Sequence, residues 1–319
     1  MEMKRQQNKQ QKAALSNMSL QNKKKLSVRL WHYRWFYVMF LPVFAALLVF
    51  NLLPMAGVLY SFTEYTPFSP PAFTGLDNFK TLFASPLFWR AFWNTLQISF
   101  LKMVLTLVTS IGLALLLDEI PSVGFRKVAQ TVVYIPHFIS WVVVAAIFTM
   151  LLSPKTGIVN AIIEAFGGTP IYFLADEGWW RPIFYLINIW KETGWGTIIF
   201  VAALAGVDQE LHEAAKIDGA NRIQRVVHIA LPAISGTILV VFILNLAKVL
   251  NLFEPVWVLQ NSMVLSVSDV LETYVYRMGI TSADYGLSTA AGLFKSVISV
   301  ILVLITNKAS KIINGEEVI

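Results

Sequence analysis

The segment Glu213–Ala220, with the sequence Glu-Ala-Ala-Lys-Ile-Asp-Gly-Ala, decides the fold of this chain. It is polar and charged, and it lies between two long apolar runs at about 181–207 and 232–252. Loops between apolar runs of this length are often short and featureless, whereas this one is rich in residues that favour helix. The segment therefore predicts a structured polar element between two membrane helices.

Two helices separated by a turn are expected within this loop. Glu, Ala and Lys favour helix up to Ile217, and Gly219 can end or bend a helix because it has no Cβ. A second helical stretch is expected from about Asn221. Pro232 suits the first turn of the following long helix, where its missing N–H costs little. A helix–turn–helix surface of this kind is suited to docking on another protein.

The composition indicates an integral membrane protein. The chain has 319 residues, of which 56% are hydrophobic and 14% charged, and its mean hydropathy is +0.62. A soluble domain averages about 25% charged residues, and the apolar runs here have the length that spans a bilayer. The chain contains no cysteine, which excludes a disulfide framework, a cysteine metal site and a cysteine nucleophile.

The first 34 residues are basic and rich in Lys, Gln and Asn. They lack the short apolar core and small-residue cleavage site of a signal peptide. Because Lys and Arg next to a span sort to the cytoplasm, residues 1–34 are predicted to form a disordered cytoplasmic tail that touches anionic lipid rather than nucleic acid. The apolar run that follows, at about 35–60, is expected to be an uncleaved first helix.

Apolar runs of about twenty residues predict six spanning helices in an all-α membrane domain over 35–307. They lie at about 35–60, 94–117, 130–151, 181–206, 232–252 and 287–306.

The distribution of basic residues predicts the orientation of these helices. With the basic tail inside, the loops at 118–129 and 208–231 and the short tail 308–319 are cytoplasmic. These segments hold seven Lys and Arg residues, whereas the outer loops hold few, chiefly Lys80, Arg90, Lys155 and Arg277. The outer segments at 66–88, 153–180 and 254–286 are rich in Pro, Gly and aromatic residues. Two interpretations stay open for them: an interfacial aromatic belt, or a platform for an external binding protein.

Four segments together resemble a known family. They are Glu213–Ala220 with Ile229–Pro232 after it, Tyr134–Trp141, Ile189–Lys191 and Gly292–Lys295. From about Pro42 onward the chain resembles permease subunits of binding-protein-dependent ABC importers, in the carbohydrate branch and there the permeases for complex oligosaccharides. The resemblance implies the six-helix type I ABC importer transmembrane fold, with the 208–231 loop as a cytoplasmic coupling helix in a groove of the ATPase subunit.

The resemblance also implies partners, a location and coupling residues. The expected complex contains a second, related permease in a heterodimer, two cytoplasmic ATPase subunits and an extracellular or lipid-anchored solute-binding protein that delivers an oligosaccharide. It would lie in the bacterial cell membrane with both termini of this chain in the cytoplasm. The residues expected to contact the ATPase are Glu213, Ala214, Ala215, Asp218 and Gly219.

The sequence lacks the familiar motifs for nucleotide binding, metal binding and catalysis. There is no Gly-x-x-x-x-Gly-Lys-Ser/Thr P-loop and no Gly-x-Gly-x-x-Gly, so ATP and Mg²⁺ would bind partner subunits and no cofactor is expected here. His212-Glu213 begins like a zinc-protease motif, but Lys216 stands where the second His is needed. No metal site and no catalytic residues are predicted.

Several polar residues lie at or within the apolar runs, where a charge costs at least about 2.5–3.5 kcal/mol. They are Lys102, Asn188, Lys191, Glu192, Asn245, Lys248, Asn251 and Lys295. Lys102 is expected to snorkel toward the membrane surface. Pairing of Lys191 with Glu192 is not expected, because adjacent helix residues point apart. For Asn245, Lys248, Asn251 and Lys295, a substrate pathway and a role in joining helices stay equally open.

The fifth predicted helix carries the best candidate for a substrate pathway. Asn245, Lys248 and Asn251 are spaced at i, i+3 and i+6, roughly one face of a helix, and Glu254 and Trp257 follow. Polar groups beside aromatic rings suit a sugar, whose hydroxyls take hydrogen bonds and whose C–H faces pack on rings. These five residues and Asn188 form the predicted pathway.

Two other classes of function fit the sequence less well than an importer subunit. An ion-coupled secondary carrier of small polar solutes should have prominent intramembrane acids, and Glu192 is the one clear acid inside a predicted span. A membrane-embedded enzyme would need a catalytic set, which the sequence lacks.

Overall fold

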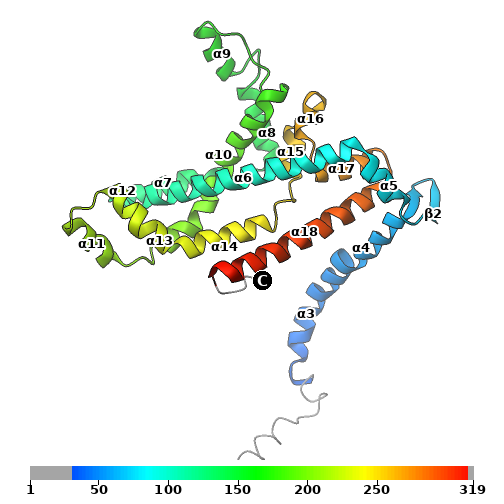
Figure 1. The fold of residues 1–319 in the computed structure, drawn as a ribbon, viewed down its shortest axis with the longest axis horizontal. Coiled ribbons are helices and arrows are strands. Elements are labelled where there is room, and N and C mark those ends of the chain that lie inside the picture. The colour runs from blue at the N-terminus through cyan, green and yellow to red at the C-terminus, as the bar shows by residue number, and fades with distance from the viewer. Residues whose placement is uncertain (1–30, 315–319) are drawn as a thin grey trace, which may run out of the picture. The chain divides into compact units, whose positions relative to one another are not determined.

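The computed structural model describes residues 31–314, with side chains for 31–308, 310 and 311, and it is mostly helical (Figure 1). The chain divides into two compact units between Val58 and Leu59. Most of the predicted basic tail lies outside the described residues, as does the end of the predicted carboxy-terminal tail.

The first unit contains a long apolar helical run. It consists of α3 (Arg34–Leu47), the π-helical turn η1 (Leu48–Leu52) and α4 (Leu53–Met55), and the 3₁₀ helix η2 (Ala56–Phe62) continues the run past the division between the units. The 29 residues Arg34–Phe62 are long and apolar enough to cross a membrane. They match the first predicted span.

Prolines explain two of the π-helical turns. The turn Leu48–Leu52 precedes Pro54, and the turn η4 (Val226–Ala230) precedes Pro232. A proline inside a helix clashes with the carbonyl four residues before it. A π turn adds a residue to the turn at that point and widens it, so the chain remains helical through both prolines.

The second unit begins with a short hairpin that the all-α prediction did not include. Strand β1 (Thr63–Thr66) pairs antiparallel with β2 (Ser69–Phe73), and α5 (Asp77–Ala84) follows. The Asn78 side-chain amide donates to the Thr63 carbonyl at 2.9 Å, which ties α5 to the hairpin.

Two long helices form the centre of the second unit. Helix α6 (Pro86–Asp118) has 33 residues and α10 (Glu177–Leu204) has 28, which correspond to about 50 Å and 42 Å of helix. The hydroxyls of Thr109 and Thr193 are 2.8 Å apart, and the Ser110 hydroxyl donates to the Thr193 carbonyl at 3.1 Å. Small polar side chains thus hold these helices close together.

The predicted span 130–151 is not one straight helix. Helix α7 (Val123–Tyr134) continues into the 3₁₀ helix η3 (Ile135–Phe138), and the chain then turns by 99° into α8 (Trp141–Leu151). The Ser140 hydroxyl accepts from the Val143 backbone N–H at 3.3 Å and so caps the new helix. The apolar run continues through the bend, so hydropathy alone did not predict it.

The predicted span 232–252 is also corrected. The helical stretch Arg222–Ala233 meets α14 (Ser235–Leu246) at an angle of 61°. Pro232 therefore lies near the end of one helical stretch instead of opening the next. Helix α14 starts later and ends earlier than predicted. The short elements before the bend are α12 (Arg222–Arg225), η4 and α13 (Leu231–Ala233).

The remaining elements connect or follow these helices. They are α9 (Ile158–Ala165), α11 (Gln209–Ile217), α15 (Glu254–Leu259), η5 (Ser262–Val264), α16 (Leu265–Ser268), α17 (Leu271–Tyr276), η6 (Arg277–Thr281) and α18 (Tyr285–Asn314).

Five candidate membrane spans are present in the described part of the chain when each bent pair counts as one. Arg34–Phe62, Pro86–Asp118 and Tyr285–Lys308 are straight candidates. The remaining predicted span, 181–206, corresponds to α10. This helix is long enough but not apolar enough, because polar residues such as Lys191, 3% exposed, interrupt it. A helix that turns its charges into the protein need not be apolar throughout.

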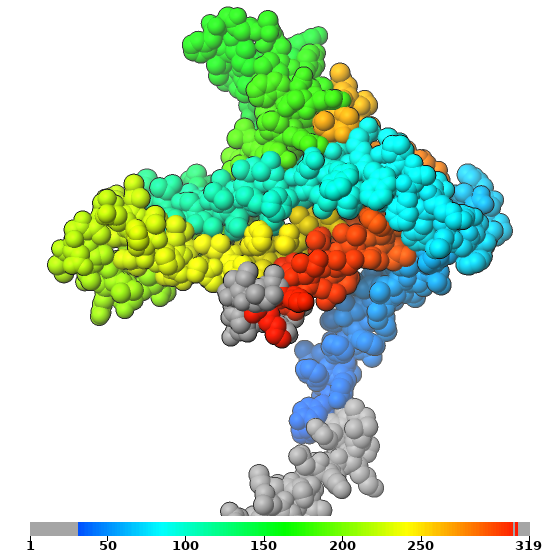
Figure 2. Space-filling model, viewed as in Figure 1, coloured from blue at the N-terminus to red at the C-terminus, as the bar shows by residue number. Residues whose placement is uncertain are grey.

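Three clusters of buried apolar residues stabilise the second unit. One surrounds the first half of α10 with α8 and α15, one joins α5 and α6 to α17 and α18, and one joins α6 and α10 to the bend before α14. In Figure 2, α6, α14 and α18 form adjacent bands on one face of this unit. The space between α6, α10 and the end of α14 contains the candidate site.

Candidate functional site

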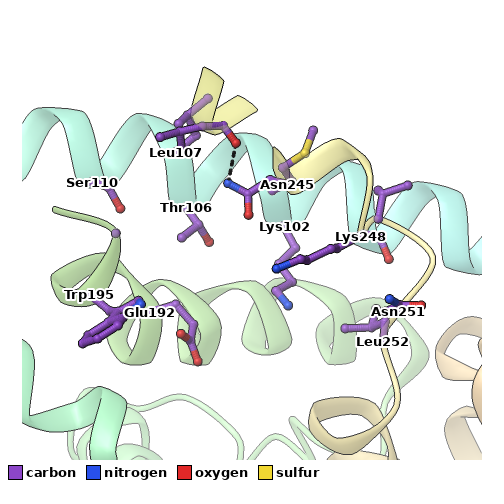
Figure 3. Close-up of a pocket in the computed structure, with 15 residues that line it drawn as sticks. Lys102, Thr106, Leu107, Ser110, Glu192, Trp195, Asn245, Lys248, Asn251 and Leu252 are labelled. Atoms are coloured by element: carbon purple, nitrogen blue, oxygen red, sulfur yellow. Dashed lines mark hydrogen bonds between the residues drawn. The ribbon is translucent and has the colours of Figure 1, made fainter. Parts of the chain in front are cut away.

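A cavity of about 260 Å³ lies between α6, α10 and the carboxy-terminal end of α14 (Figure 3). Its lining combines apolar and polar side chains from all three segments. The polar ones are Ser99, Lys102, Thr106, Ser110, Glu192, Asn245, Lys248 and Asn251. The ring of Trp195 also contributes to the wall. Hydroxyls, amides, ammonium groups and an aromatic ring are therefore gathered around one space.

Three residues of the predicted pathway meet in this cavity, although the predicted helical stripe is wrong. Helix α14 ends at Leu246, so Lys248 and Asn251 lie in the turns that follow. The Lys248 N–H donates to the Asn245 carbonyl at 3.1 Å, and the Asn251 N–H donates to the Lys248 carbonyl at 2.9 Å. Such i to i+3 turns have three residues per turn. Residues spaced by three therefore still share a side.

Lys102 does not snorkel as expected. It lines the cavity from the middle of α6, and Figure 3 shows its side chain and that of Lys248 extending into the space beside α10. Neither lysine forms an ion pair with a residue in the described ranges. The packing of α14 and the following turn against α6 leaves Lys102 half-buried beside the cavity, and the sequence of α6 alone does not contain that information.

Two hydroxyls on the α6 wall have unused hydrogen-bonding capacity. The Oγ of Ser99 and the Oγ1 of Thr106 are buried and have no hydrogen-bond partner among the described residues. A buried polar atom without a partner costs about 1–3 kcal/mol. Groups of this kind are characteristic of a site completed by water or by a ligand.

Sequence reasoning missed the contact between Glu192 and the Tyr134–Trp141 segment. His137 Nδ1 lies 2.9 Å from Glu192 Oε2, and the His137 ring stacks on Trp195 with centroids 4.5 Å apart. The Lys191 ammonium donates to the His137 carbonyl at 2.6 Å. These partners are too far apart in sequence to form a local motif.

Lys191 and Glu192 come closer than predicted. Lys191 Nζ is 3.9 Å from Glu192 Oε1, so the expectation that these neighbours do not pair is wrong, although the contact is long. The shorter contacts of both residues are to His137. Both side chains therefore contact the same residue of η3.

The other residues of the predicted pathway lie elsewhere. Asn188 is 1% exposed, and its amide donates to the Phe184 carbonyl at 2.7 Å within α10. Glu254 and Trp257 are on α15 and do not line the cavity. Lys295, for which two interpretations stayed open, forms an ion pair with Glu272 that joins α18 to α17.

The predicted helix–turn–helix is confirmed at the far end of the second unit. Helix α11 begins at Gln209 and is capped by Asp208, whose Oδ1 accepts from the Glu210 N–H at 2.9 Å. It ends before Gly219, which has a φ of +82°, and the Ala220 N–H then bonds back to the Ala215 carbonyl at 2.8 Å. Left-handed backbone at this position favours glycine.

The five predicted coupling residues lie in the second half of α11 and in the turn that follows it. Glu213, Ala214, Asp218 and Gly219 are exposed, and Ala215 is half-buried. Ala215, Asp218 and Gly219 also line a hollow of about 400 Å³ between the end of α11 and the α12–η4 stretch. We call the residues Glu213–Gly219 the coupling ridge, and the hollow lies beside it.

An acidic residue links the start of α12 to the end of α6, and no local sequence pattern predicts this link. Glu119, the residue after α6, lies 3.7 Å from Arg222 Nε and 3.8 Å from Arg225 Nη2. Arg225 is buried, whereas the Arg222 side chain is 77% exposed. Ion pairs therefore connect the end of α6 with α12.

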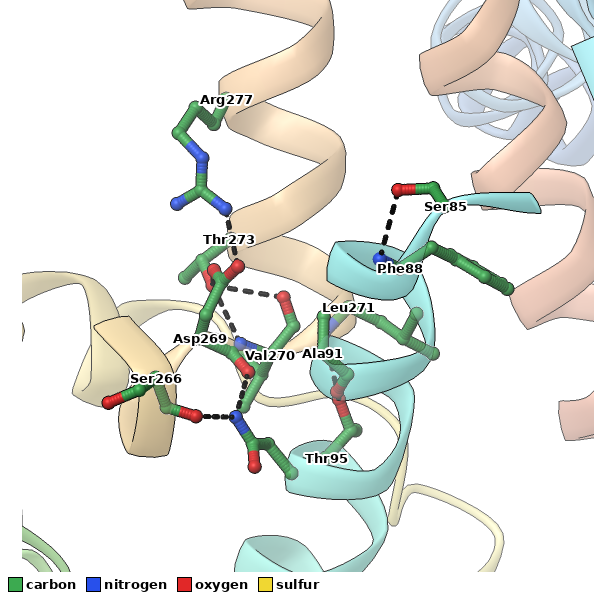
Figure 4. A network of polar contacts seen from close by, with 11 residues as sticks. Ser85, Phe88, Ala91, Thr95, Ser266, Asp269, Val270, Leu271, Thr273 and Arg277 are labelled. Atoms are coloured by element: carbon green, nitrogen blue, oxygen red, sulfur yellow. Dashed lines mark hydrogen bonds and ion pairs between the residues drawn. The ribbon is translucent and has the colours of Figure 1, made fainter. Parts of the chain in front are cut away.

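A polar network holds the α16–α17 segment against α6 and α10. The Asn94 amide donates to the carbonyls of Ser266 and Asp269 at 3.1 and 3.0 Å, and an Arg181 Nη2–H donates to Asn94 Oδ1 at 2.7 Å. Figure 4 shows Asp269 between Thr273 and Arg277, with which it forms a hydrogen bond and an ion pair. The network fixes the backbone that leads from α15 toward α18.

No group of three or more His, Asp or Glu side chains that could bind a metal ion occurs within residues 31–308.

Comparison with known proteins identifies the family. Residues 107–312 match the family described as the binding-protein-dependent transport system inner membrane component. The chain belongs to this family. It is 45% identical over 282 residues to Protein LplB of Bacillus subtilis (strain 168), covering 87% of this chain and 89% of that protein.

Two further relatives carry names that state a substrate. The polygalacturonan/rhamnogalacturonan transport system permease protein YteP of Bacillus subtilis (strain 168) is 40% identical and covers 91% of this chain and 92% of its own length. A chain of a bacterial alginate ABC transporter, solved in complex with alginate pentasaccharide-bound periplasmic protein, superposes with a TM-score of 0.84 at 38% identity. That match covers 92% of this chain and all of the other.

These comparisons confirm the class of protein and its membrane fold. The chain is a multi-pass inner-membrane permease subunit of a binding-protein-dependent ABC importer. ATP hydrolysis belongs to a separate subunit, and the permease chain itself has no cofactor. The secondary carrier and the membrane-embedded enzyme are thereby set aside.

Proposed function

We propose that this permease imports oligosaccharides through the cavity between α6, α10 and the end of α14. The observation that carries the proposal is the lining, in which free hydroxyls, the amides of Asn245 and Asn251, and the Trp195 ring surround one space. Sugar hydroxyls hydrogen-bond to such groups, and sugar C–H faces pack on aromatic rings. The names of two relatives, a polygalacturonan/rhamnogalacturonan permease and an alginate transporter, support the same substrate class.

Coupling to the ATPase is assigned to Glu213, Ala214, Ala215, Asp218 and Gly219. Their ridge is exposed and stands beside a hollow, as expected for an element that sits in a groove of another subunit. When ATP closes the ATPase subunits, the ridge moves with them as a rigid body. The helices around the cavity then change from inward-facing to outward-facing.

The complete importer is proposed to contain four further protein subunits. They are a second, related permease that forms a heterodimer with this chain, two cytoplasmic ATPase subunits, and an external or lipid-anchored solute-binding protein. Residues 1–34 and 308–319 are cytoplasmic tails of the permease domain 35–307. The concentration of Lys and Arg in the tails and in the 118–129 and 208–231 loops supports this orientation.

The route is tested with the variant Asn251→Leu in the complete importer. Loss of an amide that bonds to the sugar should slow oligosaccharide uptake about fivefold or more, since one hydrogen bond contributes about 1 kcal/mol. Asn188→Leu is the control, because Asn188 is buried in α10 and does not line the cavity. Uptake into proteoliposomes and thermal stability are measured for both. Equal uptake by Asn251→Leu and the unmodified protein would exclude this residue from the route.

A further inference from the structure

We infer that the cavity selects oligosaccharides that carry carboxylate groups, and that Lys102 and Lys248 bind those carboxylates. This inference rests on the proposed function, since it concerns the substrate class of the same cavity. It assigns a specificity role to two residues of this chain, one on α6 and one in the turn after α14.

The charges around the cavity do not balance. Lys102 and Lys248 contribute two ammonium groups, and Glu192 is the one acidic side chain among the described residues that line the space. The Glu192 carboxylate is already in contact with His137 at 2.9 Å and with Lys191 at 3.9 Å. Neither cavity lysine has an ion-pair partner among the described residues. The lining therefore has an excess of positive charge.

The positions of the two lysines suit a ligand that lies between the segments. On α6, Ser99, Lys102 and Thr106 are spaced at i, i+3 and i+7, which is one face of a helix. Two buried hydroxyls without partners thus flank the Lys102 ammonium along the same wall. Lys248 reaches into the space from the other side (Figure 3). A sugar with a carboxylate can bond to the hydroxyls and to an ammonium group together.

The chemistry favours an acidic sugar over a neutral one of the same shape. The Lys102 side chain is half-buried and the Lys248 side chain is exposed at the cavity mouth. Partial removal from water favours an opposite charge beside Lys102, and two like charges near each other repel. A carboxylate supplies that charge through a short, charge-assisted hydrogen bond. A neutral sugar leaves the ammonium groups without it, and a site with unpaired polar groups rejects such an analogue. The lysines thereby select among oligosaccharides of similar size.

The test uses the complete importer in proteoliposomes with a saturating amount of loaded binding protein. The probes are trigalacturonate and its fully methyl-esterified form, which is uncharged. Lys102→Met and Lys248→Met should each lower trigalacturonate uptake about tenfold to a hundredfold, the equivalent of one charge-assisted hydrogen bond. Lys102→Arg and Lys248→Arg keep the charge and should retain most of the uptake. Lys80→Met changes an exposed side chain on α5 and should have no effect.

The remaining outcomes separate this inference from the proposed function. If both Met variants, with normal thermal stability and ATPase binding, import trigalacturonate at the unmodified rate, the inference is overturned. It is also overturned if the unmodified importer takes up the ester as fast as the acid. The oligosaccharide route itself then stands. If the unmodified importer takes up neither these probes nor any neutral oligosaccharide, the proposed function fails.

Discussion

At the scale of single residues, Gly219 is a position where the backbone conformation favours one residue type. Its φ is +82°, and a Cβ added there would meet no heavy atom within 4 Å. Gly219→Ala should therefore destabilise the loop by roughly 1–2 kcal/mol through backbone strain alone. Thermal unfolding of the purified importer measures the effect, together with the dependence of ATP hydrolysis on loaded binding protein.

The control for this prediction is Gly112→Ala. Gly112 lies inside α6, and a Cβ there would also meet nothing within 4 Å. Alanine is favoured over glycine in a helix by up to about 1 kcal/mol, so this change should leave the importer as stable as before or slightly more stable. Equal stability losses in both variants would show that φ at Gly219 is not the cause.

Residues could be predicted from the sequence where a local pattern was enough. Gly219 followed from its lack of a Cβ in a run of helix formers, and its helix end is confirmed. The His137–Glu192 contact could not be predicted, because it depends on how α7 and η3 pack on α10. Lys102 was misplaced for a related reason: its surroundings are set by α14 and the turn after it, far away in the chain.

At the scale of elements, the link between α6 and α12 through Glu119 should transmit movement of the coupling ridge. Glu119→Gln leaves the buried Arg225 without its acid, and the junction should lose about 1–3 kcal/mol. Arg222→Gln should cost less than about 0.5 kcal/mol, because Arg222 is exposed. We expect ATP hydrolysis to become less dependent on loaded binding protein in Glu119→Gln but not in Arg222→Gln. Identical behaviour of the two variants would contradict a role for this link.

Helices could be predicted from hydropathy, whereas their bends could not. Apolar runs located α3, α6 and α18 because a membrane span needs about twenty apolar residues. The bends of 99° after η3 and 61° before α14 fall inside continuous apolar runs. Turns and caps within such runs change the direction of the chain without changing its hydropathy. The two-stranded hairpin was missed because it lies in a short segment rich in Pro and aromatic residues.

At the scale of the whole molecule, the orientation in the membrane is a prediction from charge alone. The chain has no cysteine, so a single cysteine can be introduced without background. Asn221 lies in the loop predicted to be cytoplasmic, so Asn221→Cys should resist an impermeant thiol reagent in intact cells. Lys155 lies in a predicted outer segment, so Lys155→Cys should react. Labelling in the opposite pattern would show that the orientation is reversed, and the coupling ridge could then not contact a cytoplasmic ATPase.

Family and class could be predicted from the sequence because the coupling loop is a local motif, and the comparisons confirm both. The substrate route could be predicted only in part. The spacing of Asn245, Lys248 and Asn251 pointed to residues that do line one cavity, but Asn188, Glu254 and Trp257 lie outside it. Which polar residues share a space depends on helix packing, which no single stretch of sequence contains.

The most direct test of the sugar route is a structure of the complete importer with a bound oligosaccharide. The complex would be held by ATPase subunits that bind but do not hydrolyse ATP, and supplied with loaded binding protein. The account predicts sugar between α6, α10 and the end of α14, within hydrogen-bond distance of Lys248 and Asn251. Sugar bound instead beside Trp257 and Thr149, which line a separate hollow of about 700 Å³, would contradict it.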